Sequence, residues 1–498
     1  MSLVALKSDL LRAGSRWALV FAGLGFLSGC AVGPRYAKPV APAPPAYKEM
    51  PPNWKAAEPS DETAKGKWWQ VFQDPQLDAL EDQVNVSNQT LKAAQAQFEQ
   101  ARAAVRINRS AQYPNVTAGM SATRNHISTN RPNGRLSPTT NYTDLQFPLD
   151  ASYEVDLWGR VRKTVEAARA NAQASAADLE NVSLSLHAEL ANDYFQLRAL
   201  DAEEQLLNST VAAYEKALEL TRNRYSGGIV SQVDVAQAQT QLETTRAQAV
   251  DLGVQRAQFE HAIAVLTGKP ASSFALPTSP LASTPPVVPL GLPSDLLERR
   301  PDVAGNERRM AAANAQIGIA RAAYFPTIML GASGGFESTS ITTWFNGPAG
   351  FVTAGASAIE TVFDAGRRRA VTDQARAAYD QSVANYRETV LGAFQEVEDS
   401  LAGLRLLEDE AKTQEVAVAA AQQSLQLSTN RYKGGVATYL EVITAQSIAL
   451  TDQRAAVEIA GRRMAASVSL IKALGGGWNS ASLPVVQKDT RSPASSGQ

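Results

Sequence analysis

The chain has 498 residues, of which 44% are hydrophobic, 19% are charged and 7% are aromatic, so it is neither collagen-like nor globally disordered. A formal net charge of -2 and the absence of a run of Lys and Arg argue against nucleic acid as a partner. One cysteine and three widely separated histidines provide no disulfide framework and no metal-ligand spacing. We therefore expect no metal and no cofactor.

Residues 1–29 have the layout of a secretory signal peptide. Basic residues precede an apolar stretch at residues 17–27, which as a helix of about 16 Å would be too short to cross a membrane. The stretch ends in small residues followed by Cys30, an arrangement that resembles the bacterial lipobox. The resemblance implies lipid attachment at Cys30, and Ala31 after it implies the outer membrane. A chance cysteine in a signal peptide is the alternative.

Proline-rich stretches divide the rest of the chain. Residues 30–72 are predicted to be an extended N-terminal segment, because proline fixes φ and removes a backbone donor. A second proline-rich stretch, residues 269–293, predicts a linker between two halves, residues 73–268 and residues 294–475. Residues 476–498 are expected to form a C-terminal tail.

The two halves are copies of one unit. The segment RYSGGIVSQVDVAQAQ at residues 224–239 lines up with RYKGGVATYLEVITAQ at residues 431–446. Upstream, DLWGR matches FDAGR and AQYPNV matches AYFPTI, in the same order. A repeat of this kind predicts that each half contains a helix, two strands, a long helix, a tight tip and a returning helix.

The longest predicted elements are helices at residues 159–225 and 366–432, which lack proline and are rich in strong helix formers. Each would be about 100 Å long, and its charges exclude a membrane location. Apolar residues at coiled-coil spacing predict that both helices pack against neighbours. They are Leu207, Val211, Tyr214, Leu218 and Tyr225 in the first copy, and Val418, Ala421, Leu425 and Tyr432 in the second.

Glycine pairs are predicted to form the hairpin tips, because glycine supplies the positive φ of a helix C-cap. The pairs are Gly227 with Gly228 and Gly434 with Gly435. The returning helix of each copy starts with a hydroxyl residue followed three positions later by an acidic one, which predicts a capping box in both copies. These residues are Ser231 and Asp234, then Thr438 and Glu441.

Before each long helix the period of the pattern changes to two. Every odd position of residues 145–157 is apolar, which predicts a strand with one apolar and one polar face, and Pro148 predicts a bend or bulge in it. A partner strand is expected from Val116, and a weaker pair from Thr327 and Gly350. Four strands cannot close a barrel in lipid, where barrels start at eight strands, so a membrane sheet needs further copies. An ordinary soluble sheet is the alternative.

Five segments resemble the TolC-like outer membrane factors of tripartite RND efflux systems, in the lipoprotein branch related to OprM and NodT. They are LPSDLLERRPDV from Leu292, NAQIGIARAAYFP from Asn314, YEVDLWGRVR from Tyr153, and the RYxGG tips. The resemblance implies a mainly α-helical homotrimer with a twelve-stranded transmembrane β-barrel in the outer membrane and a helical tunnel in the periplasm. It also implies two partners, a periplasmic adaptor and an inner-membrane pump, and passive export of drugs or other small molecules.

In that family the periplasmic helix ends form an iris, and the resemblance places Asp234, Tyr432 and Glu441 at gate positions. Thr444 and Ala437 depart from the family pattern, which implies a less ionic closure. Capping remains an alternative role for the two acidic residues, and coiled-coil packing an alternative role for the tyrosine.

The two rival classes of function are an enzyme and a structural lipoprotein. The sequence has no GxSxG elbow and no GxxxxGK[ST] loop, which argues against an enzyme. A structural coiled-coil lipoprotein or adhesin would explain the helices and the lipid. It would leave the strand pairs and the repeat without a purpose.

Overall fold

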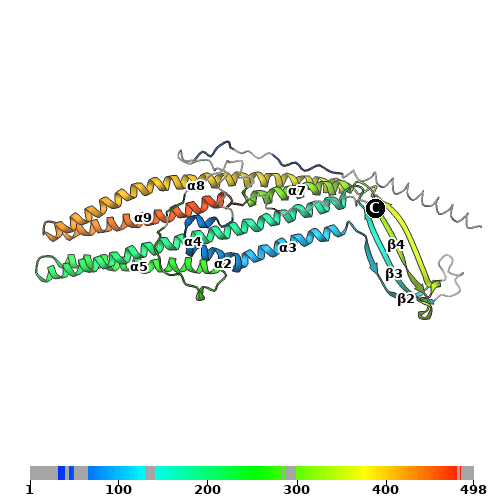
Figure 1. Cartoon of the computed structure of the whole chain (residues 1–498), viewed down its shortest axis with the longest axis horizontal. Coiled ribbons are helices and arrows are strands. Elements are labelled where there is room, and N and C mark those ends of the chain that lie inside the picture. The colour runs from blue at the N-terminus through cyan, green and yellow to red at the C-terminus, as the bar shows by residue number, and fades with distance from the viewer. Residues whose placement is uncertain are drawn as a thin grey trace, which may run out of the picture.

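A computed structural model describes residues 32–39, 44–49, 66–128, 141–282, 284–286, 299–478 and 483. The predicted signal peptide and Cys30 lie outside the described residues, as does most of the predicted C-terminal tail. The described chain is elongated, with a long helical bundle and a sheet at one end of it (Figure 1).

Each half contributes one very long helix and one returning helix. In the first half α4 (Arg160–Ser226) has 67 residues and α5 (Gln232–Leu266) has 35. In the second half α8 (Arg367–Lys433) also has 67 residues and α9 (Tyr439–Ala473) has 35. The remaining α-helices are α2 (Pro75–Ser87), α3 (Gln89–Ser110) and α7 (Pro301–Ala322). The short helices are η2 (Trp68–Phe72), η4 (Ala271–Ser273), η6 (Ile341–Thr343) and η7 (Gly347–Ala349).

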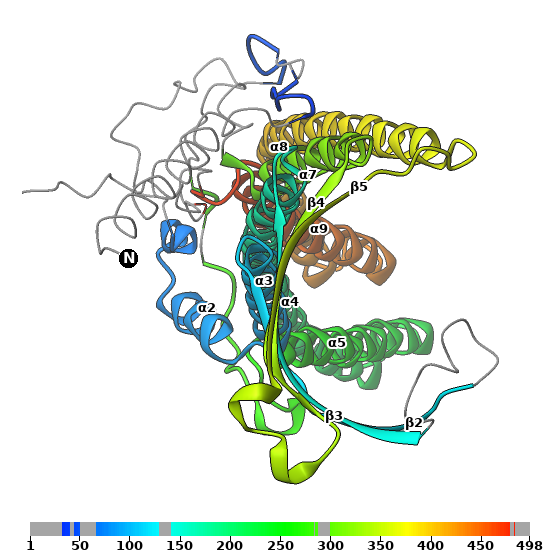
Figure 2. The same cartoon turned by 90° about the vertical axis from the view of Figure 1, so that its right-hand side faces the viewer.

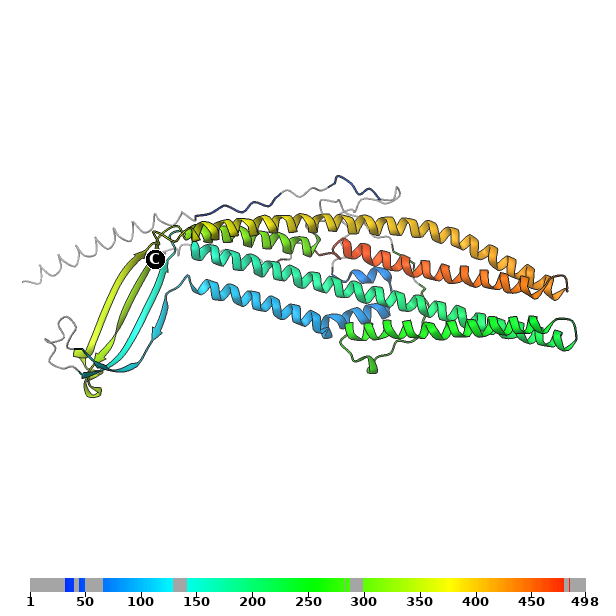
Figure 3. The same cartoon turned by 180° about the vertical axis from the view of Figure 1, so that it is seen from behind.

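The two long hairpins, α4 with α5 and α8 with α9, run side by side away from the sheet (Figure 3). Contacts between α4 and α9 join the hairpins, and α7 packs between α4 and α8. The main core lies near the middle of the bundle, where Trp68, Phe72, Phe195 and Tyr386 are buried. Within the described ranges, no helix combines the length and the apolar character that a membrane span requires.

The sheet is antiparallel and contains five segments, β1 (Asn115–Ala118), β2 (Ser121–His126), β3 (Asn141–Val155), β4 (Thr327–Ser338) and β5 (Gly350–Ile359). Both β1 and β2 pair with β3, and the order continues through β4 to β5. The four predicted strands are therefore present, and the first of them is interrupted between β1 and β2.

The interruption lies opposite Pro148. We expected a bend in the strand that contains this proline, but β3 is continuous through it. The break is in the partner strand instead, where the Gly119 amide donates to the Pro148 carbonyl at 3.0 Å. On the other side Pro148 faces Gly335, where an added Cβ would lie 2.0 Å from the Phe147 carbonyl oxygen. The proline is thus accommodated by glycine on both neighbouring strands.

The register gives the sheet two different faces. Side chains alternate between the faces along each strand, so residues paired across strands share a face. One face carries the apolar rows Leu149 with Gly334 and Val352, Ala151 with Ala332 and Ala354, and Tyr153 with Leu330 and Ala356. The opposite face carries the rows Asp150 with Ser333 and Thr353, and Ser152 with Gly331 and Gly355. The predicted alternation is therefore consistent across three strands.

Aromatic residues lie at both ends of the sheet. Near the helices, Trp158 stacks on Phe325 with ring centroids 4.6 Å apart. At the far end, Phe345 contacts Phe147, Phe336 and Trp344. A strand of about ten residues, tilted by about 40°, spans roughly 25 Å between these ends, which is the height of the apolar band of a membrane barrel.

Viewed along the long axis, the sheet forms an arc (Figure 2). The hairpin helices α5 and α9 lie on the concave side of the arc, and α2 lies on the convex side. Residues 32–39 and 44–49 follow the outside of the bundle. Val32 donates to the Trp158 carbonyl at 3.0 Å, and the amides of Lys48 and Glu49 donate to the Glu398 carboxylate.

Candidate functional site

The candidate site is formed by the two hairpin tips at the end of the bundle away from the sheet (Figure 1). Each long helix ends in the same hydrogen-bond pattern. Ile229 donates to the Arg224 carbonyl and Gly228 to the Tyr225 carbonyl, both at 2.9 Å. Gly228 has a φ of 74° and Gly435 has a φ of 77°. The first glycine of each pair is helical, so only the second supplies the left-handed conformation that the tip requires.

The capping box predicted for the first copy is present. The Asp234 carboxylate accepts from the Ser231 amide at 3.1 Å, and the Ser231 hydroxyl accepts from the Asp234 amide at 3.4 Å. The Asp234 carboxylate therefore satisfies the backbone amide of Ser231 at the start of α5.

The capping box predicted for the second copy is wrong. Thr438 makes no side-chain cap within the described part of the chain. Glu441 instead pairs with Arg431 at 3.4 Å. The extra methylene of glutamate lets the carboxylate reach a guanidinium on the preceding helix, and a charged donor is a stronger partner than a backbone amide.

An apolar cluster joins the two tips. Its buried members are Tyr214, Leu218, Ala238 and Leu242 of the first hairpin, and Tyr432, Tyr439 and Val442 of the second. The Tyr432 and Tyr439 rings lie 5.2 Å apart. Burial, with Tyr432 nearby, raises the pKa of Tyr439 to about 12, so the Tyr439 phenol is neutral near pH 7.

The packing predicted for the apolar residues at coiled-coil spacing is present within one chain, apart from one residue. Leu207, Tyr214 and Leu218 are buried, as are Ala421 and Tyr432. Tyr225 is 45% exposed and lies outside the apolar cluster, although it occupies the position in the first copy that Tyr432 occupies in the second.

Arg224 links the two hairpins and was not singled out by sequence reasoning. Its Nη1 donates to the Tyr432 carbonyl at 2.7 Å, and its guanidinium lies over the Tyr432 ring at 4.5 Å from the centroid. The signal that could have identified Arg224 is the Arg-Tyr pair before each glycine pair, because both copies of the repeat retain the arginine.

The single chain does not bring the predicted gate residues into one hydrogen-bonded group. Asp234 is bound to Ser231, and Glu441 is paired with Arg431. The Tyr432 hydroxyl is buried and has no hydrogen-bond partner among the described residues. The Thr444 hydroxyl donates to the Leu440 carbonyl at 2.9 Å, so it is bonded within its own helix and not to a predicted gate residue.

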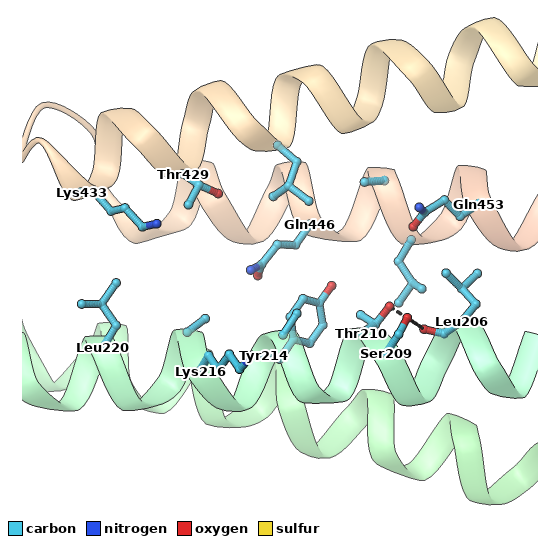
Figure 4. A pocket seen from close by; sticks show the side chains of 15 residues that line it. Leu206, Ser209, Thr210, Tyr214, Lys216, Leu220, Thr429, Lys433, Gln446 and Gln453 are labelled. Carbon is cyan, nitrogen blue, oxygen red and sulfur yellow. Dashed lines mark hydrogen bonds between the residues drawn. The ribbon is translucent and has the colours of Figure 1, made fainter.

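Beside the tip cluster, a groove of about 430 Å³ lies between the hairpins. It is lined from α4, α8 and α9 by residues that include Tyr214, Lys216, Thr429, Lys433 and Gln446 (Figure 4). Its lining mixes lysine and amide side chains with apolar ones. Among the described residues, no group of three His, Cys, Asp or Glu could hold a metal ion.

Comparison with known proteins decides the family. The family model described as outer membrane efflux protein matches residues 80–269 and 292–476. The chain belongs to the outer membrane efflux protein family. It is therefore an outer-membrane protein of efflux, mostly helical with a strand part, as the sequence predicts.

Individual relatives agree with this assignment. The probable efflux pump outer membrane protein TtgC of Pseudomonas putida is 34% identical over 454 residues, which cover 91% of this chain and 93% of the relative. The pyoverdine export outer membrane protein OpmQ of Pseudomonas aeruginosa is 32% identical over 445 residues, which cover 88% of this chain and 94% of the relative. The solved outer-membrane channel OprN has a TM-score of 0.82 at 29% identity, with 90% of this chain and 100% of that chain covered.

Proposed function

We propose that the protein is the outer-membrane exit duct of a tripartite efflux system. A periplasmic adaptor and an inner-membrane pump of the RND type deliver drugs or other small molecules to it, and the duct itself is passive rather than enzymatic. The observation that carries this proposal is a sheet that sorts its side chains into an apolar and a polar face, although neither of its edges is paired within the part of the chain that the structure describes. Such a sheet is suited to lipid once its edges are closed.

Closure by three copies accounts for the two open edges. The β1–β2 edge and the β5 edge have no partner strand among the described residues of one chain, and backbone groups in lipid require partners. Pairing β5 of one copy with β1 and β2 of the next would close a twelve-stranded barrel in a homotrimer. Exposed apolar residues on the hairpin helices, such as Val250 and Val254 of α5 and Leu406 and Val416 of α8, favour a matching helical tunnel.

The lipid on Cys30 belongs to the same proposal. Val32 is hydrogen-bonded to Trp158, where the sheet meets the helices. Two residues of chain reach at most about 7 Å, so acyl chains on Cys30 would start at the base of the sheet, beside the membrane. Cys30→Ser is expected to abolish labelling of the protein by radioactive palmitate. Labelling that persists in this variant would place the lipid elsewhere.

A gate at the tips completes the proposal. The proposal assigns Asp234, Tyr432 and Glu441 to this gate, in which the Tyr432 hydroxyl, buried and without a hydrogen-bond partner among the described residues, would gain an acceptor as the tips close. The test is conductance of the purified protein in a planar bilayer. The wild type should conduct rarely, and Asp234→Ala with Tyr432→Phe should open more often. A protein that never conducts, in either form, would contradict the duct and favour a structural lipoprotein.

A further inference from the structure

The contact between Arg224 and Tyr432 joins the first hairpin to the second within one chain. The sequence repeat places Arg431 where Arg224 lies in the other copy, and Tyr225 where Tyr432 lies. Both Arg-Tyr pairs occupy the last turn of a helix that ends in the same hydrogen-bond pattern. The two copies therefore present the same side chains in the same local conformation.

Only one half of this repeated arrangement is satisfied within the described chain. Tyr432 is 4% exposed, because the first hairpin covers it, whereas Tyr225 is 45% exposed. The Arg431 side chain is 59% exposed, and its contact is with Glu441 of its own hairpin. A guanidinium that is paired at its edge keeps its planar face free for an aromatic ring.

We propose that Arg431 stacks on Tyr225 of the next subunit and repeats, between chains, the contact that Arg224 makes with Tyr432 within a chain. The inference rests on the proposed homotrimer, in which first and second hairpins alternate around the tunnel. The partner in this contact is a second copy of this chain. Arg431 and Tyr225 are the members of the repeated pair that make no arginine–tyrosine stack within the described part of one chain, so each supplies the partner of the other in the next copy.

The contact between subunits has fewer aromatic neighbours than the contact within a subunit. The repeat puts Ala421 in the position of Tyr214 and Gln232 in the position of Tyr439. The interface between subunits thus lacks two of the rings that cover Tyr432. Arg431 and Tyr225 therefore carry a larger share of its stability, and the tips separate between subunits before they separate within one.

Chemical cross-linking tests the contact itself. In Tyr225→Cys/Arg431→Cys, a short bismaleimide is expected to give products of two and three chains on a denaturing gel. In the matched variant Arg224→Cys/Tyr432→Cys, it should join cysteines of the same chain and leave a single-chain band. The wild type, which has Cys30 and neither introduced cysteine, measures the background of cross-linking. A single-chain product from the first variant, in a protein that is trimeric and conducts, would overturn the contact and leave the exit duct intact.

Conductance tests what the contact does. Arg431→Ala and Tyr225→Ala are each expected to raise the open fraction about tenfold, the scale of a partly desolvated cation–π contact. Tyr225→Phe keeps the ring and should behave as wild type, and the double variant Arg431→Ala/Tyr225→Ala should open no more than either single one. Arg222→Ala, which removes an exposed charge from the same helix end, is the control. Equal opening of Tyr225→Phe and Tyr225→Ala would contradict the ring contact, whereas a non-conducting monomer would also remove the exit duct.

Discussion

A buried acid and a buried histidine join α2 to α4. Glu81 is fully buried, with its carboxylate 2.5 Å from His187 Nδ1, while His187 Nε2 lies 3.1 Å from the Asn85 side-chain oxygen. Trp69 stacks on the imidazole at 4.4 Å. Burial raises the pKa of Glu81 and lowers the pKa of His187 to about 4. The pair is therefore held as a neutral acid that donates to a neutral imidazole, whose Nε2–H donates to Asn85.

This pair predicts a window of maximal stability. In the unfolded chain the carboxyl titrates near 4.5 and the imidazole near 6.5, so both states hold one proton between these values. Above pH 6.5 the unfolded state loses its proton while the folded pair keeps one. Below pH 4.5 the unfolded state binds a second proton. Stability should therefore decrease above pH 6.5 by up to about 1.4 kcal/mol for each pH unit. Below pH 4.5 it should decrease only until about pH 4, where His187 of the folded pair takes up the second proton.

Thermal unfolding measured from pH 4 to pH 8 tests this window. The variant Glu81→Gln/His187→Gln, in which neither group titrates, should show a flatter profile than the wild type. Equal profiles for the two proteins would show that the pair does not control the pH dependence.

The two roles of Asp234 can be separated at the same scale. Ser231→Ala removes the hydroxyl of the capping box and leaves the carboxylate, at a cost of about 1 kcal/mol to the tip. Asp234→Asn removes the charge and keeps the size. If Asp234 acts in the gate, bilayer recordings should show more opening for Asp234→Asn than for Ser231→Ala. Equal opening of the two variants would indicate that capping is its whole role.

At the scale of elements, the sequence predicted both long helices because their determinants are local. Proline-free runs of strong helix formers set their lengths, and glycines mark their ends. The capping box at Thr438 was predicted wrongly because Arg431 competes for Glu441 across the tip. The contact of Arg224 with Tyr432 was missed because the two residues are 208 positions apart in the sequence.

Substitution of the two glycines of one tip by alanine should affect the stability of the tip differently. Gly435→Ala would put a Cβ on a residue with a φ of 77° and should destabilise the tip by about 1 kcal/mol. Gly434 is helical, so Gly434→Ala should be neutral or slightly stabilising. Hydrogen exchange of amides at the start of α9 measures the difference. Faster exchange in Gly434→Ala than in Gly435→Ala would contradict the assigned conformations.

In the strands, alternation alone predicted the two faces, because the period of two is a property of the sequence. The interruption of the first strand was not predictable from its own residues, since it is set by Pro148 on the neighbouring strand. Sheet register, like the tip contacts, depends on partners distant in sequence.

At the scale of the whole molecule, the two faces of the sheet should respond differently to charge. Ala354 lies in an apolar row and Thr353 in a polar one. A lysine on the lipid face near the middle of a barrel costs about 2–4 kcal/mol, whereas the lumen side is more tolerant. Ala354→Lys should therefore reduce the amount of assembled protein in the outer membrane, and Thr353→Lys should not. The opposite order would invert the assignment of the faces.

In the proposed homotrimer, the edges of the described sheet and the exposed Tyr225 find their partners in further copies of the chain. The most direct measurement of this claim is the mass of the detergent-solubilised, membrane-extracted protein by native mass spectrometry. The account predicts a species of three chains with their lipids. A species of one chain, stable in detergent under the same conditions, would contradict it.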